Sequence, residues 1–211
     1  MTAAPPARPQ ATRARARTTA APAARRRLGR DDRRAAILDA ATIAFARCGY
    51  SLTSMADISG VAGVSHLIVY RHFDSKEVLY GAVLDQAVWR LEAALPADGA
   101  VGTHGVTPAA LLAAARSDRA GFEVLWRHAP REPEFSRWAD RARAGLLELT
   151  ESALADLVGP GHRAWAARAT VAYLVEAVLV WIEDGDPGYA ERFVRATTAA
   201  MRAGVRSWVE V

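Results

Sequence analysis

The chain has 211 residues, of which 51% are hydrophobic and 24% charged, a composition typical of one or two globular domains with an ordinary core. Its one cysteine, Cys48, excludes an intrachain disulfide and a cysteine-rich zinc site, and the helical pattern around it favours a buried thiol over a reactive one. The net charge of +4 is unevenly spread. Residues 1–30 hold eight arginines and no acid, so the rest carries 19 bases against 23 acids, a net of −4.

The first 30 residues are rich in Ala, Pro, Arg and Thr and cannot bury a core, so we expect a disordered arm rather than a targeting peptide. The longest apolar run, TVAYLVEAVLVWI (residues 170–182), contains Glu176 and is shorter than the ~20 residues that span a bilayer. We therefore expect a cytoplasmic protein whose basic arm attracts a polyanion. The alternative for the arm is a passive solubilising tail.

The rest of the chain is expected to be all-α, because apolar residues recur at helical spacing and no alternating strand pattern is present. Residues 31–80 form one predicted domain and residues 81–211 a second. In the first domain, Thr53 or Ser54 is the expected N-cap of the second helix and Gly63 its end, and Ser65 and Ser75 cap the next two helices. About nine helices are expected, over residues 31–48, 54–62, 65–72, 75–95, 108–116, 118–129, 132–157, 163–183 and 188–208.

A helix, a short turn with glycine and a second helix, supported by a first helix, is helix-turn-helix architecture, in which the second helix of the pair enters the DNA major groove. The stretch TSMADISGVAGVSHLIVYRHFDSKEVL (residues 53–79) resembles the DNA-binding signature of tetracycline-repressor (TetR) family regulators. Residues 33 to about 80 match that signature in order and spacing. The resemblance implies a homodimeric, ligand-responsive transcription regulator that acts as a repressor, with an effector-binding and dimerisation domain after the DNA-binding domain.

On a helical wheel of the predicted third helix, Val69 shares a face with Phe73, and we expect both to pack in the core. Leu67 lies opposite with Arg71, and Ile68 is on a flank. Leu67 and Ile68 are therefore candidates for contact with thymine methyl groups, although Ile68 could instead pack against a neighbouring helix. The resemblance also places these positions over the bases, where the family more often has smaller or more polar residues.

Polar residues around this helix have the chemistry of phosphate contacts, because hydroxyl, imidazole and ammonium groups can donate to phosphate oxygens. The alternatives are a core imidazole at His72 and a Tyr70 ring that packs on the first helix with only its hydroxyl free. Residues 31–84 hold five bases against six acids, so the arginine-rich arm is expected to supply non-specific attraction to DNA. The complete set of predicted DNA contacts is Thr53, Ser54, Ser65, His66, Leu67, Ile68, Tyr70, Arg71, His72 and Lys76.

In the second domain, the resemblance implies a small-molecule pocket and a dimer interface formed by the last two helices. Aromatic residues along the middle helices are pocket candidates, although at helical spacing they are often core residues. Glu176 is the most polar candidate; it needs a partner if buried, and could instead lie at an interface edge. The pocket candidates are Trp89, Phe122, Trp126, His128, Phe135, Trp138, Tyr173 and Glu176.

The predicted 163–183 helix is apolar on most sides, and small residues recur every four positions in the last helix, which suits close helix packing in a symmetric dimer. An internal core contact is the alternative. The interface candidates are Val178, Trp181, Phe193, Ala200, Met201, Gly204 and Trp208.

Enzymatic motifs are missing from the sequence: it has no HExxH, no nucleophile elbow and no phosphate-binding glycine loop. The acidic stretch EDGDPG (residues 183–188) is expected to be a turn between helices rather than a calcium loop, because it is too short and lacks the terminal glutamate. We expect neither an enzyme nor a cofactor or metal. The rival hypothesis is a ligand-binding or scaffolding protein without a specific operator.

Overall fold

A computed structural model of the chain describes residues 29–95 and 105–209. Within these two stretches the fold is all-α with no strand, as the sequence predicts. The predicted arm lies outside the described residues. The elements are α1 (Arg30–Leu52), α2 (Met55–Ala62), α3 (His66–Tyr70), α4 (Lys76–Ala94), α5 (Pro108–Ser117), α6 (Arg119–Glu123), the π-helical turn η1 (Val124–His128), the 3-10 turn η2 (Ala129–Arg131), α7 (Ser136–Ala153), α8 (Pro160–Asp184), the 3-10 turn η3 (Pro187–Tyr189) and α9 (Ala190–Val209).

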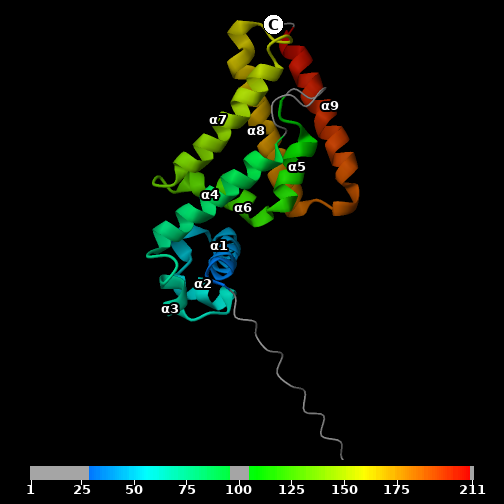
Figure 1. Cartoon of the computed structure of the whole chain (residues 1–211). Helices are drawn as coiled ribbons and strands as arrows, with labels where there is room; N and C mark the ends of the chain where they lie inside the picture. The colour runs from blue at the N-terminus through cyan, green and yellow to red at the C-terminus, as the bar shows by residue number, and fades with distance from the viewer. Residues whose placement is uncertain (1–28, 96–104, 210–211) are drawn as a thin grey trace, which may run out of the picture.

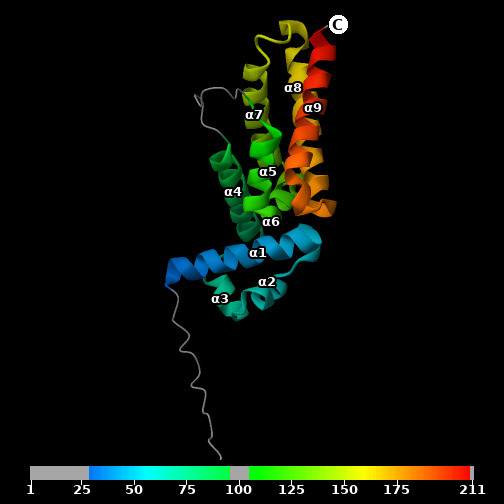
Figure 2. The ribbon, with the colours of Figure 1, turned by 90° about the vertical axis from the view of Figure 1, so that its right-hand side faces the viewer.

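The helices are arranged as a small three-helix unit at one end and a larger body beside it (Figure 1). α1, α2 and α3 form the small unit, and α4 leads from it into the body, where it packs against α5, α6 and α7. The long helices α7, α8 and α9 run away from the small unit, and the C-terminal end of α9 lies at the far end of the molecule (Figure 2). The small unit therefore presents α2 and α3 at an end that the body leaves open.

Local capping explains where the first helices begin and end. Ser54 is the N-cap of α2 and forms a reciprocal capping box with Asp57, in which the Ser54 Oγ accepts from the Asp57 amide (3.2 Å) and the Asp57 carboxylate accepts from the Ser54 amide (2.8 Å). Gly63 ends α2 with φ of 63°, and Gly49 breaks α1 near its end with φ of 75°, both in the left-handed region that glycine favours. Ser75 caps α4 through the Val78 amide, as predicted.

One continuous apolar core joins the small unit to the body. It includes Ile37 and Phe45 of α1, Ile58 of α2, Tyr80 of α4 and many residues of the body helices. The ring of Tyr80 lies edge-on to Phe45, with centroids 4.7 Å apart. Because the core is shared, burial of these side chains fixes the orientation of α1 on the body.

α8 is the helix whose apolar length differs from the sequence prediction. Its 25 residues are long and apolar enough to cross a membrane by length and composition alone, whereas the apolar run by itself is shorter. In the fold α8 packs against α5, α7 and α9, and residues such as Leu174 and Val178 are fully buried. A core helix of this kind passes the same test without entering a membrane.

Candidate nucleic-acid interface

The side chains of α3 divide into a buried and an exposed set, as the helical wheel predicts. Val69 and Phe73 are buried in the core shared with α1 and α2. On the other side, 63% of Leu67 and 42% of Tyr70 are exposed, and His66 and Arg71 are exposed as well. An exposed leucine is not needed for packing here, so the apolar side chain is available for contact with another molecule.

Two predicted contacts at the flank of α3 are only partly available. Ile68 is half-buried and packs against the core, which favours the alternative that it supports the helix rather than facing bases. His72 is also half-buried. The His66 ring lies edge-on to the Tyr70 ring, with centroids 4.7 Å apart, so these two exposed side chains form one aromatic ridge along the outside of α3.

Thr53 does not lie at the surface, and its prediction as a phosphate contact is wrong. Its side chain is only 3% exposed, and its hydroxyl donates to the Gly49 carbonyl at 2.7 Å, within the turn that ends α1. The N-cap of α2 is Ser54, one residue later, which is exposed and whose hydroxyl donates to the Asp57 carboxylate at 2.6 Å. Ser65 is exposed at the start of α3 but its side chain makes no cap hydrogen bond, so its hydroxyl is not committed there.

Lys76, a predicted phosphate contact, is half-buried and engaged within the domain. Its ammonium donates to the Tyr50 carbonyl (3.0 Å) and lies 4.2 Å from the centroid of the Tyr50 ring. The Tyr50 hydroxyl donates to the Glu77 carboxylate at 2.8 Å. Hydrogen bonds to Glu77 from the Ser75 side chain, from its own backbone amide and from Tyr50 lower the pKa of Glu77 to about 2.

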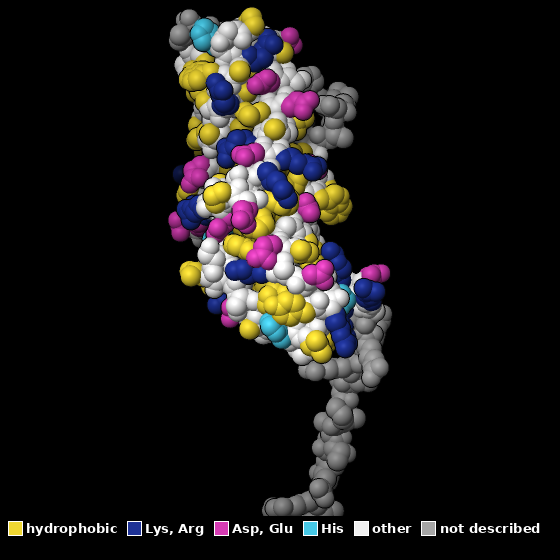
Figure 3. All heavy atoms as spheres, turned by 90° about the vertical axis from the view of Figure 1, so that its left-hand side faces the viewer, with side chains coloured by type: hydrophobic (Ala, Val, Ile, Leu, Met, Phe, Trp, Pro, Cys, Tyr) yellow, Lys and Arg dark blue, Asp and Glu magenta, His cyan; other side chains and the backbone are white. Residues whose placement is uncertain are grey.

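Cationic side chains lie beside α3, although residues 31–84 hold five bases against six acids. Arg34 of α1 is exposed with its guanidinium 4.7 Å from the ring of Phe73, so this cation lies close to the start of the α3–α4 turn. On the face in Figure 3, histidine, basic and hydrophobic side chains gather at the end of the molecule formed by the small unit. A surface of apolar and cationic groups suits contact with base edges and phosphates together.

Cys48 is exposed, so its prediction as a buried thiol is wrong. It follows Phe45 and Ala46 on α1 and directly precedes Gly49, whose φ of 75° breaks the helix. Helical spacing places Cys48 on the apolar face of α1, but it does not show whether another element covers the last turn of that helix.

The predicted pocket residues do not gather around one cavity. Phe122, Trp126 and Phe135 are buried in the core, and the Trp138 indole donates to Asp85 at 2.8 Å. Nε2 of His128 lies 3.0 Å from the Ala46 carbonyl. The exposed candidates are Trp89, Tyr173 and Glu176, and a carboxylate oxygen of Glu176 lies 4.0 Å from Arg127. A cavity of about 700 Å³ lies elsewhere, between α5, α7, α8 and α9, and none of these candidates lines it.

Most of the predicted interface residues pack inside the subunit. Val178 is fully buried, Trp181 stacks on Phe193 with centroids 4.6 Å apart, and Trp208 lies edge-on to Trp165 at 4.9 Å. Met201 and Gly204 are half-buried, and Ala200 is exposed. The outer face of α8 instead exposes three large hydrophobic residues that sequence reasoning did not assign to an interface: Trp165, Tyr173 and Val180.

A capped α2, a left-handed glycine turn and an α3 with an exposed outer face, all supported by α1, define a helix-turn-helix DNA-binding domain. Residues 37–83 match the model of the family described as bacterial regulatory proteins of the tetR family, so this part of the chain is a tetR-type DNA-binding domain.

Curated relatives share the DNA-binding part of the chain. The HTH-type transcriptional repressor Rv3405c of Mycobacterium tuberculosis is 44% identical over 84 residues, which are 36% of this chain and 45% of that protein. The HTH-type transcriptional activator FasR of Mycolicibacterium smegmatis is 47% identical over 62 residues, 29% of this chain and 28% of that protein. The chain thus spans about half the length of the curated relatives it matches, or less.

Solved structures share the fold over most of the chain. A TetR-like transcriptional regulator from Rhodococcus sp. RHA1 has a TM-score of 0.62 at 22% identity and aligns with 85% of this chain and 96% of its own. NalD, described as the secondary repressor of the MexAB-OprM multidrug efflux pump in Pseudomonas aeruginosa, has a TM-score of 0.59 at 25% identity, over 82% of this chain and 97% of its own. The arrangement of small unit and body is therefore that of TetR-like regulators.

Proposed function

We propose that the chain is a cytoplasmic, sequence-specific DNA-binding transcriptional regulator, and that it acts as a homodimeric repressor whose operator binding is changed by a small molecule. The observation that carries the proposal is the exposed outer face of α3, where Leu67, Tyr70 and Arg71 lie clear of the core. In this proposal Leu67 contacts thymine methyl groups, Arg71 reads a base edge or a phosphate, and Tyr70 with Ser54 holds the DNA backbone.

The test of DNA recognition is a footprint of the purified protein on its own promoter region. Leu67→Ala should weaken the specific site by about 1–3 kcal/mol, because one base contact is lost, and Tyr70→Phe should weaken specific and non-specific DNA alike. Val78→Ala is a matched control, since Val78 is an exposed aliphatic residue on α4. If both variants left the specific footprint unchanged, the assignment of Leu67 and Tyr70 as DNA contacts would be wrong. If the wild-type protein gave no specific footprint, the rival scaffolding function would be favoured.

The proposed dimer uses the outer faces of α8 and α9. Tyr173 and Val180 are seven residues apart on α8, about two helical turns, and both are exposed beside a groove that Phe193 of α9 also lines. Val180→Arg should shift the protein toward monomer in light scattering, whereas Trp89→Arg, at an exposed tryptophan of α4, should not. Equal masses for Val180→Arg and the wild type would exclude this face.

In the proposed mechanism, one dimer state holds the two α3 helices about one DNA turn apart (~34–36 Å) and another state does not. A ligand changes operator binding only by its difference in affinity for these states. The arginine-rich arm, residues 1–28, is proposed to add non-specific phosphate contacts. Its deletion should flatten the salt dependence of DNA binding, and an unchanged slope would assign it no role in that binding.

A further inference from the structure

The cavity of about 700 Å³ lies in the half of the body away from the DNA-binding domain, between α5, α7, α8 and α9. Its size is within the range of about 300–1,000 Å³ that is usual for small-molecule pockets. Most of its wall is apolar: Leu154 and Leu157 follow α7, Val106 precedes α5, and Met201 and Val205 come from α9. A ligand of this cavity therefore has a substantial hydrocarbon part.

Two guanidinium groups give one wall of the cavity a positive charge. Arg202 and Arg206 are four residues apart on α9, so they lie one turn apart on the face that also carries Met201 and Val205. Both side chains are exposed, and within the described part of the chain neither forms an ion pair. No acidic residue is among the lining residues, so the wall attracts anions without internal neutralisation.

A buried hydroxyl adds a polar point on the wall formed by α8. The Thr170 side chain is only 4% exposed, lines the cavity, and its Oγ1 has no hydrogen-bond partner among the described residues. Thr150 lines the same cavity, but its hydroxyl already donates to the Leu146 carbonyl at 2.7 Å. A buried hydroxyl without a partner is unfavourable, so a polar atom of a ligand or of a bound water that reaches Thr170 Oγ1 would stabilise it.

We propose that this cavity binds an amphiphile with an anionic head group and a medium-length hydrocarbon chain. Arg202 and Arg206 hold the head group at the cavity mouth, since a guanidinium matches carboxylate or phosphate oxygens with two parallel hydrogen bonds. The chain lies along Leu154, Met201 and Val205, and Thr170 donates to an oxygen of the ligand or of a water molecule bound with it. The inference rests on the proposed function only in assigning this ligand the role of effector.

Calorimetric titration of the full-length protein with sodium decanoate, decyl phosphate and decan-1-ol, below micelle formation, tests the site directly. At least one anion should bind saturably and about tenfold or more tightly than the alcohol, and the two anions distinguish a carboxylate from a phosphate ligand. Arg202→Gln and Arg206→Gln should each weaken the anion severalfold and leave decan-1-ol unchanged. Arg192→Gln, at an exposed arginine of α9 outside the cavity, is the matched control.

Thr170→Val removes the unpartnered hydroxyl at nearly constant volume and should weaken anion binding more than Thr150→Val does. Equal binding of decanoate, decyl phosphate and decan-1-ol, or equal effects of Arg202→Gln and Arg192→Gln, would overturn the proposal, as would no binding of any of the three probes. Footprinting without any ligand tests the DNA-binding function separately. An anion that binds the cavity without changing the footprint leaves the site in place and removes only its regulatory role.

Discussion

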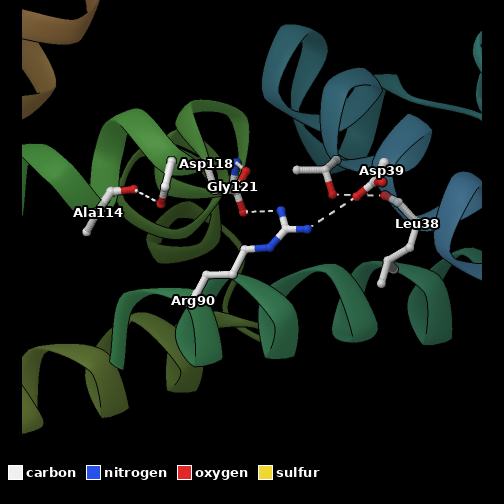
Figure 4. A network of polar contacts seen from close by, with 8 residues as sticks. Leu38, Asp39, Arg90, Ala114, Asp118 and Gly121 are labelled. Atoms are coloured by element: carbon white, nitrogen blue, oxygen red, sulfur yellow. Dashed lines mark hydrogen bonds and ion pairs between the residues drawn. The ribbon is translucent and has the colours of Figure 1, made fainter. Parts of the chain in front are cut away.

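Arg90 is the point where α4 is tied to both the DNA-binding domain and the body, and its two ion pairs should have unequal energies (Figure 4). Its Nη1 lies 2.8 Å from Asp118 Oδ2, and its Nη2 lies 3.4 Å from Asp39 Oδ1. The Asp118 side chain is 11% exposed and also accepts from the Gly121 amide at 2.9 Å, as the N-cap of α6. The Asp39 side chain is 58% exposed. The ion pair with Asp118 is therefore shielded from water much more than the ion pair with Asp39, although one guanidinium makes both.

Replacing Arg90 by Met keeps the aliphatic stem but leaves Asp118 as a mostly buried carboxylate without its cation. We expect a loss of about 1–3 kcal/mol in the free energy of unfolding, the usual cost of an unsatisfied buried group. Asp39→Asn removes only the exposed, longer pair and should cost about 0–1 kcal/mol. Because Asn is also a good N-cap, Asp118→Asn isolates the charge from the cap.

The assay is urea denaturation followed by circular dichroism at one protein concentration, since the stability of the proposed dimer would depend on concentration. A double-mutant cycle of Arg90→Met with Asp118→Asn should give a coupling energy of at least about 1 kcal/mol, and the cycle with Asp39→Asn should give less. If Arg90→Met cost no more than Asp39→Asn, burial of Asp118 would not govern the strength of this link.

Three further predictions concern the DNA-binding domain. Phe73→Ala should cost about 3–5 kcal/mol of stability in thermal melting, because the ring is fully buried, and the exposed Val78→Ala should cost almost nothing. The pKa of Glu77 is about 2 in the fold against 4.5 ordinarily, so this carboxylate stabilises the protein above pH 4.5 and loses that effect as the pH falls toward 2. Tyr50→Phe should raise the pKa of Glu77 in an NMR titration. An unchanged pKa would show that the Tyr50 hydroxyl does not contribute to the shift. Cys48 should react fully with a thiol reagent in the native protein, and labelling only after denaturation would contradict its exposure.

The DNA-binding domain is predictable from sequence because its signals are local. The Ser54–Asp57 capping box and the left-handed Gly63 are set by neighbours within a few residues, and they fix the start and the end of α2. The wheel then assigns Val69 and Leu67 to opposite sides of α3 correctly. These local signals locate the N-cap of α2 only to within one residue. That residue matters here, because Thr53 is buried whereas Ser54 lies at the surface.

The body is less predictable because the sequence of its most apolar helix, α8, does not indicate which side is buried. Along α8 nearly every side is hydrophobic, so the sequence does not distinguish the buried Val178 from the exposed Val180. Only the positions of α5, α7 and α9 decide which side of α8 meets the core. The same reason explains why the sequence does not show that Tyr173 lies on the exposed side of α8 rather than in the core. The residues that line the cavity come from four separate parts of the body, so they form no pattern along the sequence.

The contacts of α1 indicate how a change in the body would reach α3. His128 is the last residue of the π-helical turn η1, and its Nε2 lies 3.0 Å from the Ala46 carbonyl of α1. Four residues later on α1, Tyr50 holds the start of α4 through Lys76 and Glu77. α3 itself lies between α2 and the start of α4, away from the body. We therefore expect the proposed effector to act on α3 through α1 and α4. Substitutions at His128 or Tyr50 should then change the coupling between ligand binding and DNA binding more than they change the affinity for ligand alone or for DNA alone.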